Sequence, residues 1–208
     1  MSYLLYISAS PQGERSVSRS LANEFLAKFS NNNPDVQIVE RDLISNPVAH
    51  LDGETLGASW SPADTHTPSM AAKLKVRMEL INEFKGASEI LVSTPMWNWS
   101  VPSVLKAYID QLVFPGKLGG GNPNDSISAK VTVLASQGGS YAPGTPKEGW
   151  DFLSGYLTKV FTELGSKDVE VILAELNYAG MVPGMEDLVE KKLASFAKAK
   201  EKTNLRVA

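Results

Sequence analysis

Short apolar runs alternate with helix-like patterns along most of the chain. Each run is rich in valine, isoleucine, leucine or alanine and lies between polar or turn-forming residues, which is typical of strands buried on both faces. Five strands are predicted in this way, over residues 3–7, 36–39, 90–93, 131–135 and 169–174.

The segments between these runs have helical periodicity. In residues 18–30, the side chains of Leu21, Phe25 and Phe29 fall on one helical face. Thr67 is a plausible helix cap, and a proline at the first helical position follows it. Helices are predicted over residues 18–30, 68–85, 101–114, 150–164 and 185–202. Residues 45–68 are polar without clear periodicity, and no element is predicted there.

Strands that are each followed by a helix predict an α/β fold, with a parallel sheet covered by helices on both faces. The chain of 208 residues fits one domain, residues 1–208. In such sheets, ligands bind beyond the carboxyl ends of the strands, near the point where the strand order reverses. The loops after the first, third and fourth strands are therefore the places to search for a site.

The composition narrows the classes of function. The formal net charge of -3 disfavours a nucleic-acid partner, which would require a basic face. The absence of cysteine excludes disulfides, thiolate metal sites and dithiol chemistry, and His50 and His66 are too few for a histidine metal site. The N-terminal residues have no signal-peptide pattern and no membrane-spanning length. We expect a cytoplasmic protein with no metal and no membrane association.

The first loop, residues 10–18, contains the hydroxyls of Ser10, Ser16 and Ser18 at the start of a predicted helix. A helix N-terminus has unsatisfied N–H donors and partial positive charge, so it can bind a phosphate monoester without a lysine. A serine at this position can equally well only cap the helix. Both interpretations fit this loop when it is considered alone.

The second loop places two tryptophans, a methionine and an asparagine after the third strand, at Met96, Trp97, Asn98 and Trp99. Such residues suit a flat aromatic ligand, with apolar groups against its ring and amide groups at its polar edge. The alternative is a set of core aromatics beneath the sheet. The asparagine argues against that alternative, since a buried amide would need its own partners.

The third loop, residues 136–141, contains the glycine pair Gly138 and Gly139. Paired glycines allow close approach of the backbone to a ligand and positive φ angles, although a simple chain reversal is an equally good explanation. Together the three loops offer a phosphate cradle and two walls for a planar heterocycle at one sheet edge. This combination describes flavin mononucleotide (FMN) better than other common cofactors.

The sequence also resembles the bacterial FMN-dependent azoreductase and quinone reductase family of the flavodoxin-like superfamily, over nearly the whole chain. The resemblance rests on Ser10 with Ser16-Val17-Ser18, Asp42-Leu43 with Asn46-Pro47, Leu51-Asp52-Gly53-Glu54, Pro95-Met96-Trp97-Asn98-Trp99 and Ser136-Gln137-Gly138-Gly139. It implies a three-layer sandwich with strand order 2-1-3-4-5. It also implies electron-pair transfer from NADH or NADPH through FMN to quinones or azo compounds.

The resemblance assigns roles to individual residues. It implies that Ser10, Ser16, Val17 and Ser18 hold the FMN phosphate. It implies that the ring system is contacted by Pro95, Met96, Trp97, Asn98, Trp99, Ser136, Gln137, Gly138 and Gly139.

Three departures from the family pattern concern the substrate. Trp97 and Trp99 replace tyrosine and phenylalanine, and Gln137 replaces arginine. Residues 115–125 lack the aromatic-rich segment expected near the substrate. The cofactor is expected to be the same, whereas these departures leave the preference among acceptors open.

The flavin would carry the chemistry, and the protein would supply position and polarity. The nicotinamide would deliver hydride to flavin N5 and leave, and the acceptor would then use the same face in a ping-pong cycle. Backbone N–H groups near Asn98 and Gly138 would stabilise negative charge on the reduced ring. Trp60 and Tyr141 are candidates for substrate contacts. Two alternatives are a flavodoxin-type electron carrier and a non-catalytic FMN-binding regulator.

The helix at 101–114 predicts a homodimer. Its apolar residues spread over about half of its circumference, more than the stripe of about 100° that packing on one sheet face needs. A two-fold partner would cover the surplus edge, and the family resemblance agrees with this. Alternatively, residues 45–68 fold over the same edge within one chain.

Overall fold

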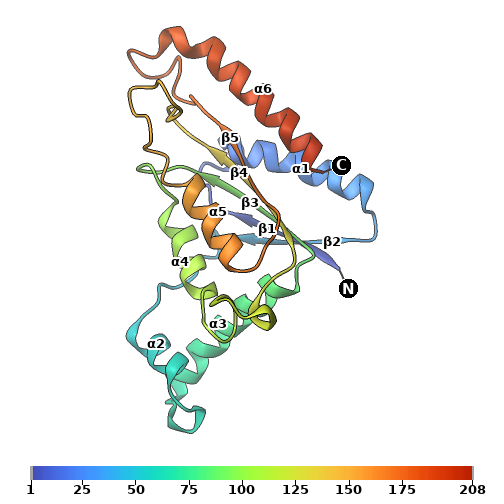
Figure 1. The fold of residues 1–208 in the computed structure, drawn as a ribbon, viewed down its shortest axis with the longest axis vertical. Coiled ribbons are helices and arrows are strands. Elements are labelled where there is room, and N and C mark those ends of the chain that lie inside the picture. Colours follow the sequence, from blue (N-terminus) through green and yellow to red (C-terminus); the bar gives the residue numbers. More distant parts are fainter. Residues whose placement is uncertain (1, 208) are drawn as a thin grey trace.

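The computed structural model describes residues 2–207 and has five parallel strands in the order β2-β1-β3-β4-β5 (Figure 1). The strands are β1 (Tyr3–Ser8), β2 (Gln37–Asp42), β3 (Glu89–Pro95), β4 (Lys130–Ser136) and β5 (Val169–Ala174). The predicted strands, their parallel direction and their order are confirmed.

The described residues form six α-helices (Figure 1). They are α1 (Val17–Asn32), α2 (Gly53–Trp60), α3 (Pro68–Gly86), α4 (Ser103–Leu112), α5 (Ser154–Glu163) and α6 (Val189–Arg206). Five of them cover the two faces of the sheet, while α2 packs against α3. Side chains of α1 and α6 share one core cluster with the sheet, and side chains of α3, α4 and α5 share the other. The predicted three-layer sandwich is therefore confirmed. None of the described helices is long and apolar enough to cross a bilayer.

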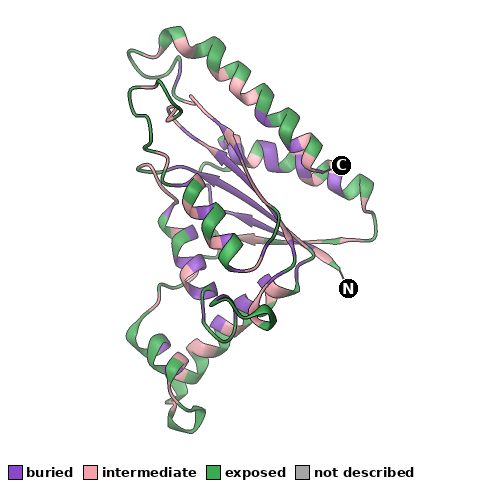
Figure 2. Cartoon of the chain, in the orientation of Figure 1, coloured by how far each residue is buried: buried purple, intermediate pink, exposed green. Residues whose placement is uncertain are grey.

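The two cores follow from the alternation of side chains along each strand. In β1, Leu4 and Tyr6 pack on the side of α1, whereas Leu5 and Ile7 pack on the side of α3, α4 and α5. The central strands are buried on both faces, as the purple colour of the sheet in Figure 2 shows. This explains why their sequences are continuous apolar runs rather than alternating ones.

One helix, α2, was not predicted, because its sequence has a polar cap and no apolar periodicity. Residues 53–60 form α2, although no element was predicted there. Asp52 caps this helix by accepting a hydrogen bond from the Thr55 N–H at 2.8 Å, and its buried residues are only Thr55 and Ala58. A helix that is held by a cap and two small side chains has little apolar periodicity. The predicted cap at Thr67 is confirmed, since its hydroxyl accepts from the Met70 N–H.

Two of the predicted helices begin later in the structure than the sequence pattern predicts. The helix predicted from residue 150 starts at Ser154, so Trp150 lies in a loop. The helix predicted over 185–202 becomes regular only at Val189 and continues to Arg206, after the short 3-10 turn η4 (Glu186–Leu188). Residues 150–153 and residue 185 therefore lie in loops at the sheet edge and not in helices.

The C-terminal half of α4 is covered within the chain. The Gln111 amide donates to the carbonyl of Ala49 at 2.8 Å, and Trp60 packs edge-on against Phe114. Arg77 of α3 is buried and donates to the carbonyls of Gln111 and Val113 at the end of α4. Residues 45–68 and α3 therefore cover the C-terminal half of α4 within one chain, which supports the alternative for that half of the helix. The homodimer itself stays a prediction.

Candidate functional site

The pairing of the central strands brings the three loops to one edge of the sheet. In the parallel ladders, Ser8 of β1 pairs with Ser93 of β3, and Pro95 of β3 pairs with Ser136 of β4. Backbone hydrogen bonds continue this pairing into the loops, from the Ala9 N–H to the Ser93 carbonyl and from the Met96 N–H to the Ser136 carbonyl. The three loops therefore begin side by side at the carboxyl ends of these strands, where the sequence predicts a site.

The first loop gathers buried hydroxyls around the start of α1. Ser10, Ser16 and Ser18 are each at most 2% exposed. Ser16 caps α1 by accepting from the Arg19 N–H, and its hydroxyl lies 3.2 Å from that of Ser18. Within residues 2–207, the N–H groups of Val17 and Ser18 have no hydrogen-bond acceptor. The cap is therefore present, and free donors remain beside it that fit a phosphate.

A half-buried arginine, Arg19, supports this loop. Arg19 donates one N–H to the Ser8 hydroxyl at 2.8 Å and another to the Asp42 carboxylate at 3.2 Å. These contacts tie the first turn of α1 to the ends of β1 and β2. The sequence analysis did not identify Arg19, because its partner at the end of β2 is known only from the sheet order.

The second loop is a tight turn closed by two backbone hydrogen bonds between Trp97 and Ser100, at 2.9 and 3.0 Å. Its central residues, Asn98 and Trp99, have φ angles of 47° and 66°, which corresponds to a type I′ turn. Asparagine adopts this conformation readily, whereas for a bulky tryptophan it is an outlier that costs conformational energy. Such strain is typical of functional positions.

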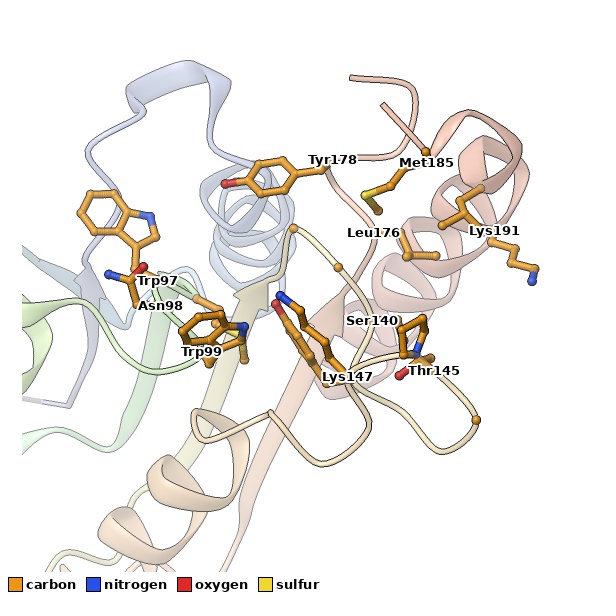
Figure 3. A pocket seen from close by; sticks show the side chains of 18 residues that line it. Trp97, Asn98, Trp99, Ser140, Thr145, Lys147, Leu176, Tyr178, Met185 and Lys191 are labelled. Atoms are coloured by element: carbon orange, nitrogen blue, oxygen red, sulfur yellow. The ribbon is translucent and has the colours of Figure 1, made fainter. Parts of the chain in front are cut away.

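The tryptophans of this turn are not core residues. Trp97 is 46% exposed, and Trp99 is half-buried against the edge of Trp150, with ring centroids 5.0 Å apart. Met96 is buried beneath them. The alternative of aromatics packed under the sheet is therefore wrong, and the exposed rings face an open space at the sheet edge (Figure 3).

The third loop is held against the chain that follows β5. The carbonyls of Gly138 and Gly139 accept hydrogen bonds from the N–H groups of Tyr178 and Leu176. A Cβ atom added to Gly138 would lie 2.4 Å from the Tyr178 ring, so no larger residue fits without movement. Neither glycine has a positive φ, so the left-handed backbone is not found. The close approach seen at Gly138 is to Tyr178 of the same chain, and an approach to a ligand stays a prediction.

Gln137 is 1% exposed and holds the loop from within. Its amide donates to Asp151 at 3.1 Å, and Asp151 in turn accepts from the N–H groups of Leu153 and Ser154 at the start of α5. The amide oxygen of Gln137 is buried without a partner among the described residues. Gln137 therefore joins the third loop to α5 and leaves one acceptor unused.

A cavity of about 870 Å³ opens between the second and third loops (Figure 3). Its walls are formed by residues 96–99, 138–141, 144–147, Leu176, Tyr178, Gly184, Met185, Leu188 and Lys191. The size lies in the range of small-molecule sites. Met96, Trp97, Asn98, Trp99, Gly138, Gly139 and Tyr141, all predicted site residues, are brought together here.

The remaining predicted residues lie around this cavity or away from it. Pro95 and Ser136 end their strands beneath it, and the first loop lies at the neighbouring strand end. Trp60 is 68% exposed at the end of α2 and lines neither this cavity nor a second one of about 670 Å³ between α4 and Phe152. Within one chain, Trp60 is therefore not brought to the site.

Sequence reasoning missed the wall formed by residues 176–191 and by Lys147. No hydrophobic pattern marks Tyr178 or Lys147 as site residues. Tyr178 becomes meaningful only because β5 lies beside β4, which places the segment after β5 against Gly138. The glycine pair was a partial signal, since a close approach requires something to approach it.

Gly138→Ala tests whether the ring of Tyr178 fixes this wall. We expect the substitution to lower the free energy of unfolding by about 1–3 kcal/mol through overpacking. In a Tyr178→Ala background the cost should fall to less than half, as a double-mutant cycle measured by urea unfolding would show. Gly155→Ala in α5, where nothing lies within 4 Å, is the matched control and should not destabilise. Equal costs in both backgrounds would contradict the contact.

Comparisons with known proteins agree with this geometry. The family described as "Flavodoxin-like fold" matches residues 2–199. An FMN-dependent NADH:quinone oxidoreductase of Frankia alni is 41% identical over 91% of both chains, and one of Frankia casuarinae is 39% identical over 100% of both. The fold is shared with the crystal structure of azoreductase AzrA (TM-score 0.84, 22% identity, 99% of both chains). It is also shared with an FMN-dependent NADH-azoreductase of Bacillus anthracis in complex with FMN (TM-score 0.81, 20% identity, 100% of both). The chain belongs to the family of FMN-dependent NADH:quinone oxidoreductases with a flavodoxin-like fold.

Proposed function

We propose that this protein is an FMN-dependent oxidoreductase that passes electron pairs from NADH to quinones, azo compounds or both. The observation that carries the proposal is the meeting of a phosphate-type helix start with an aromatic-walled cavity at one sheet edge, in a chain of this family. Bound FMN would supply the two-electron redox chemistry. The chain would supply binding, orientation and a polar surrounding.

The first loop would hold the FMN phosphate. Its donors are the free N–H groups of Val17 and Ser18 and the hydroxyls of Ser10, Ser16 and Ser18, all at the positive end of α1. These hydroxyls are buried; Ser16 and Ser18 pair with each other, whereas the Ser10 hydroxyl has only a long contact of 3.5 Å from the Gln12 N–H. A phosphate monoester would supply the missing acceptors.

The second and third loops would hold the ring system. Pro95 to Trp99 would offer apolar side chains and the Asn98 amide, and Ser136 to Gly139 would offer backbone close to the ring edge. Gln137 would act from behind, because its side chain is engaged by Asp151. The rigid hydrogen-bonded turns fix these groups before the cofactor arrives, which favours binding and polarises the site.

Donor and acceptor would use the same cavity in turn, in a ping-pong cycle. Tyr141 would contact the acceptor, since it lies in the cavity wall and its hydroxyl makes no hydrogen bond within residues 2–207. Burial, followed by the nearby Tyr178 and Asp151, raises the pKa of Tyr141. The hydroxyl therefore stays protonated and can donate a hydrogen bond to a carbonyl or azo nitrogen.

The activity is tested by steady-state oxidation of NADH with benzoquinone. We expect turnover that depends on FMN, and double-reciprocal plots at several quinone concentrations that are parallel, as a ping-pong cycle requires. A flavodoxin-type carrier or a regulator would bind FMN and show little turnover with this pair. Flavin-loaded protein that does not oxidise NADH with any quinone or azo dye would contradict the proposed function.

The phosphate assignment is tested by the double variant Ser16→Ala with Ser18→Ala. We expect FMN affinity to fall at least tenfold, about 1.4 kcal/mol, because buried donors to the phosphate are lost. Riboflavin lacks the phosphate, so its weaker binding should change little. Ser20→Ala, an exposed serine on the same helix, is the control. Equal FMN affinity in a double variant that is still folded would contradict the assignment.

We further propose that two copies associate around the second cavity. Its lining includes Val101, Phe152 and Tyr156, and Trp97 and Phe152 expose large apolar surfaces beside it. Apolar rings that remain exposed next to a site are typical of surfaces that meet a partner. In a dimer, Trp60 of one chain would contact the substrate bound to the other chain, whereas it does not line the cavity of its own chain.

Analytical ultracentrifugation over a dilution series, run beside activity, tests this association. We expect a dimer, and a shift toward monomer for Phe152→Glu, since a charge would be buried in the apolar contact. Leu205→Glu, on the exposed side of α6, is the matched control. A monomer with full turnover per flavin would contradict the proposal.

A further inference from the structure

The charged side chains that line the main cavity are all positive. Among the described residues that line it, the charged side chains are Lys147 and Lys191, and no carboxylate is present. In Figure 3, Lys147 reaches in between Trp99 and Tyr178, whereas Lys191 extends outward from α6. The lining itself therefore carries cations only, and the neighbouring carboxylates, Glu175 and Glu186, are engaged by Ser140 and Gly184 and do not line the cavity.

Lys147 is held over two rings. Its ammonium lies 5.1 Å from the centroid of Trp99 and 5.6 Å from that of Trp150. Both distances fit cation–π attraction. The loop that carries Lys147 is closed by a hydrogen bond from the Gly149 N–H to the Tyr141 carbonyl. Lys147 is exposed to solvent, and its contact with the Trp99 ring connects it to the strained turn.

The ammonium of Lys147 is attracted but not neutralised. Within residues 2–207 it has no carboxylate within 4.0 Å, in contrast to Lys106, which pairs with Asp110. The adjacent Glu148 accepts from the Gly144 N–H at 2.9 Å and does not line the cavity. Cation–π contacts orient the ammonium without neutralising its charge, so an anionic ligand would be able to pair with it.

We infer that Lys147 recognises an oxyanion carried by an aromatic acceptor, so that the cavity favours sulfonated or carboxylated quinones and azo compounds over neutral ones. The inference rests on the proposed function. The aromatic body of the acceptor would lie against Trp97, Trp99 and Tyr178, and its anionic substituent would reach the ammonium. The diphosphate of NADH carries the same oxyanion chemistry, so the donor is measured separately.

The kinetic test compares 1,4-naphthoquinone with its 2-sulfonate in the wild-type protein and in Lys147→Met. We expect the ratio of kcat/KM for the sulfonated over the neutral quinone to fall about fivefold, the scale of a solvent-accessible ion pair. Lys147→Arg should restore most of the ratio. Lys159→Met, an exposed lysine on α5 outside the cavity, changes the net charge equally and should leave the ratio unchanged.

The outcomes distinguish the source of the oxyanion. A fall in kcat/KM for NADH with an unchanged quinone ratio would overturn the assignment to the acceptor and transfer Lys147 to the dinucleotide. An unchanged ratio together with unchanged NADH kinetics would overturn oxyanion recognition altogether.

A binding measurement separates this inference from the proposed function. Anthraquinone-2-sulfonate, titrated into the flavin-loaded protein with tryptophan fluorescence as readout, requires no turnover. We expect its Kd to rise about fivefold in Lys147→Met, and added salt to weaken wild-type binding more than variant binding. Equal Kd values and equal salt dependence would overturn the inference even in an active enzyme. Absent turnover with the expected Kd difference would overturn only the proposed function.

Discussion

The site depends on the pairing of β3 between β1 and β4. This strand shares its register with both neighbours, so that Ser8, Ser93 and the Pro95–Ser136 pair end at one edge. This register fixes where the loops that follow these strands begin, and so places them next to one another. Because the strands are buried on both faces, a slip of the register would transfer whole rows of apolar side chains between the two cores, at a large cost in free energy.

Backbone hydrogen bonds make the loops rigid beyond the sheet. The turn at Trp97–Ser100 is closed on itself, and the segment at 137–139 is joined to the segment at 176–178. Trp99 holds a left-handed conformation that a tryptophan rarely adopts, and its carbonyl accepts from the Phe152 N–H. The surrounding contacts maintain this strain, which is how a scaffold preorganises a binding site.

The extent of prediction from sequence follows the physics of each signal. Buried strands and the apolar face of α1 are visible as periodicity, α3 is marked by its cap at Thr67 and the proline that follows, and the loops after β1, β3 and β4 follow from their order. Helix α2 was missed because its cap at Asp52 and its small buried residues leave no apolar period. Tyr178 and Lys147 could not be found, because their place at the cavity depends on contacts between loops far apart in the sequence.

We propose that one edge of the sheet holds FMN from its phosphate to its ring, and a crystal structure of the protein grown with FMN would show whether it does. We expect the phosphate within hydrogen-bond distance of the N–H groups of Val17 and Ser18, and the ring between residues 96–99 and 137–139. A phosphate placed away from the start of α1, or a ring outside the cavity beside Trp99, would contradict it.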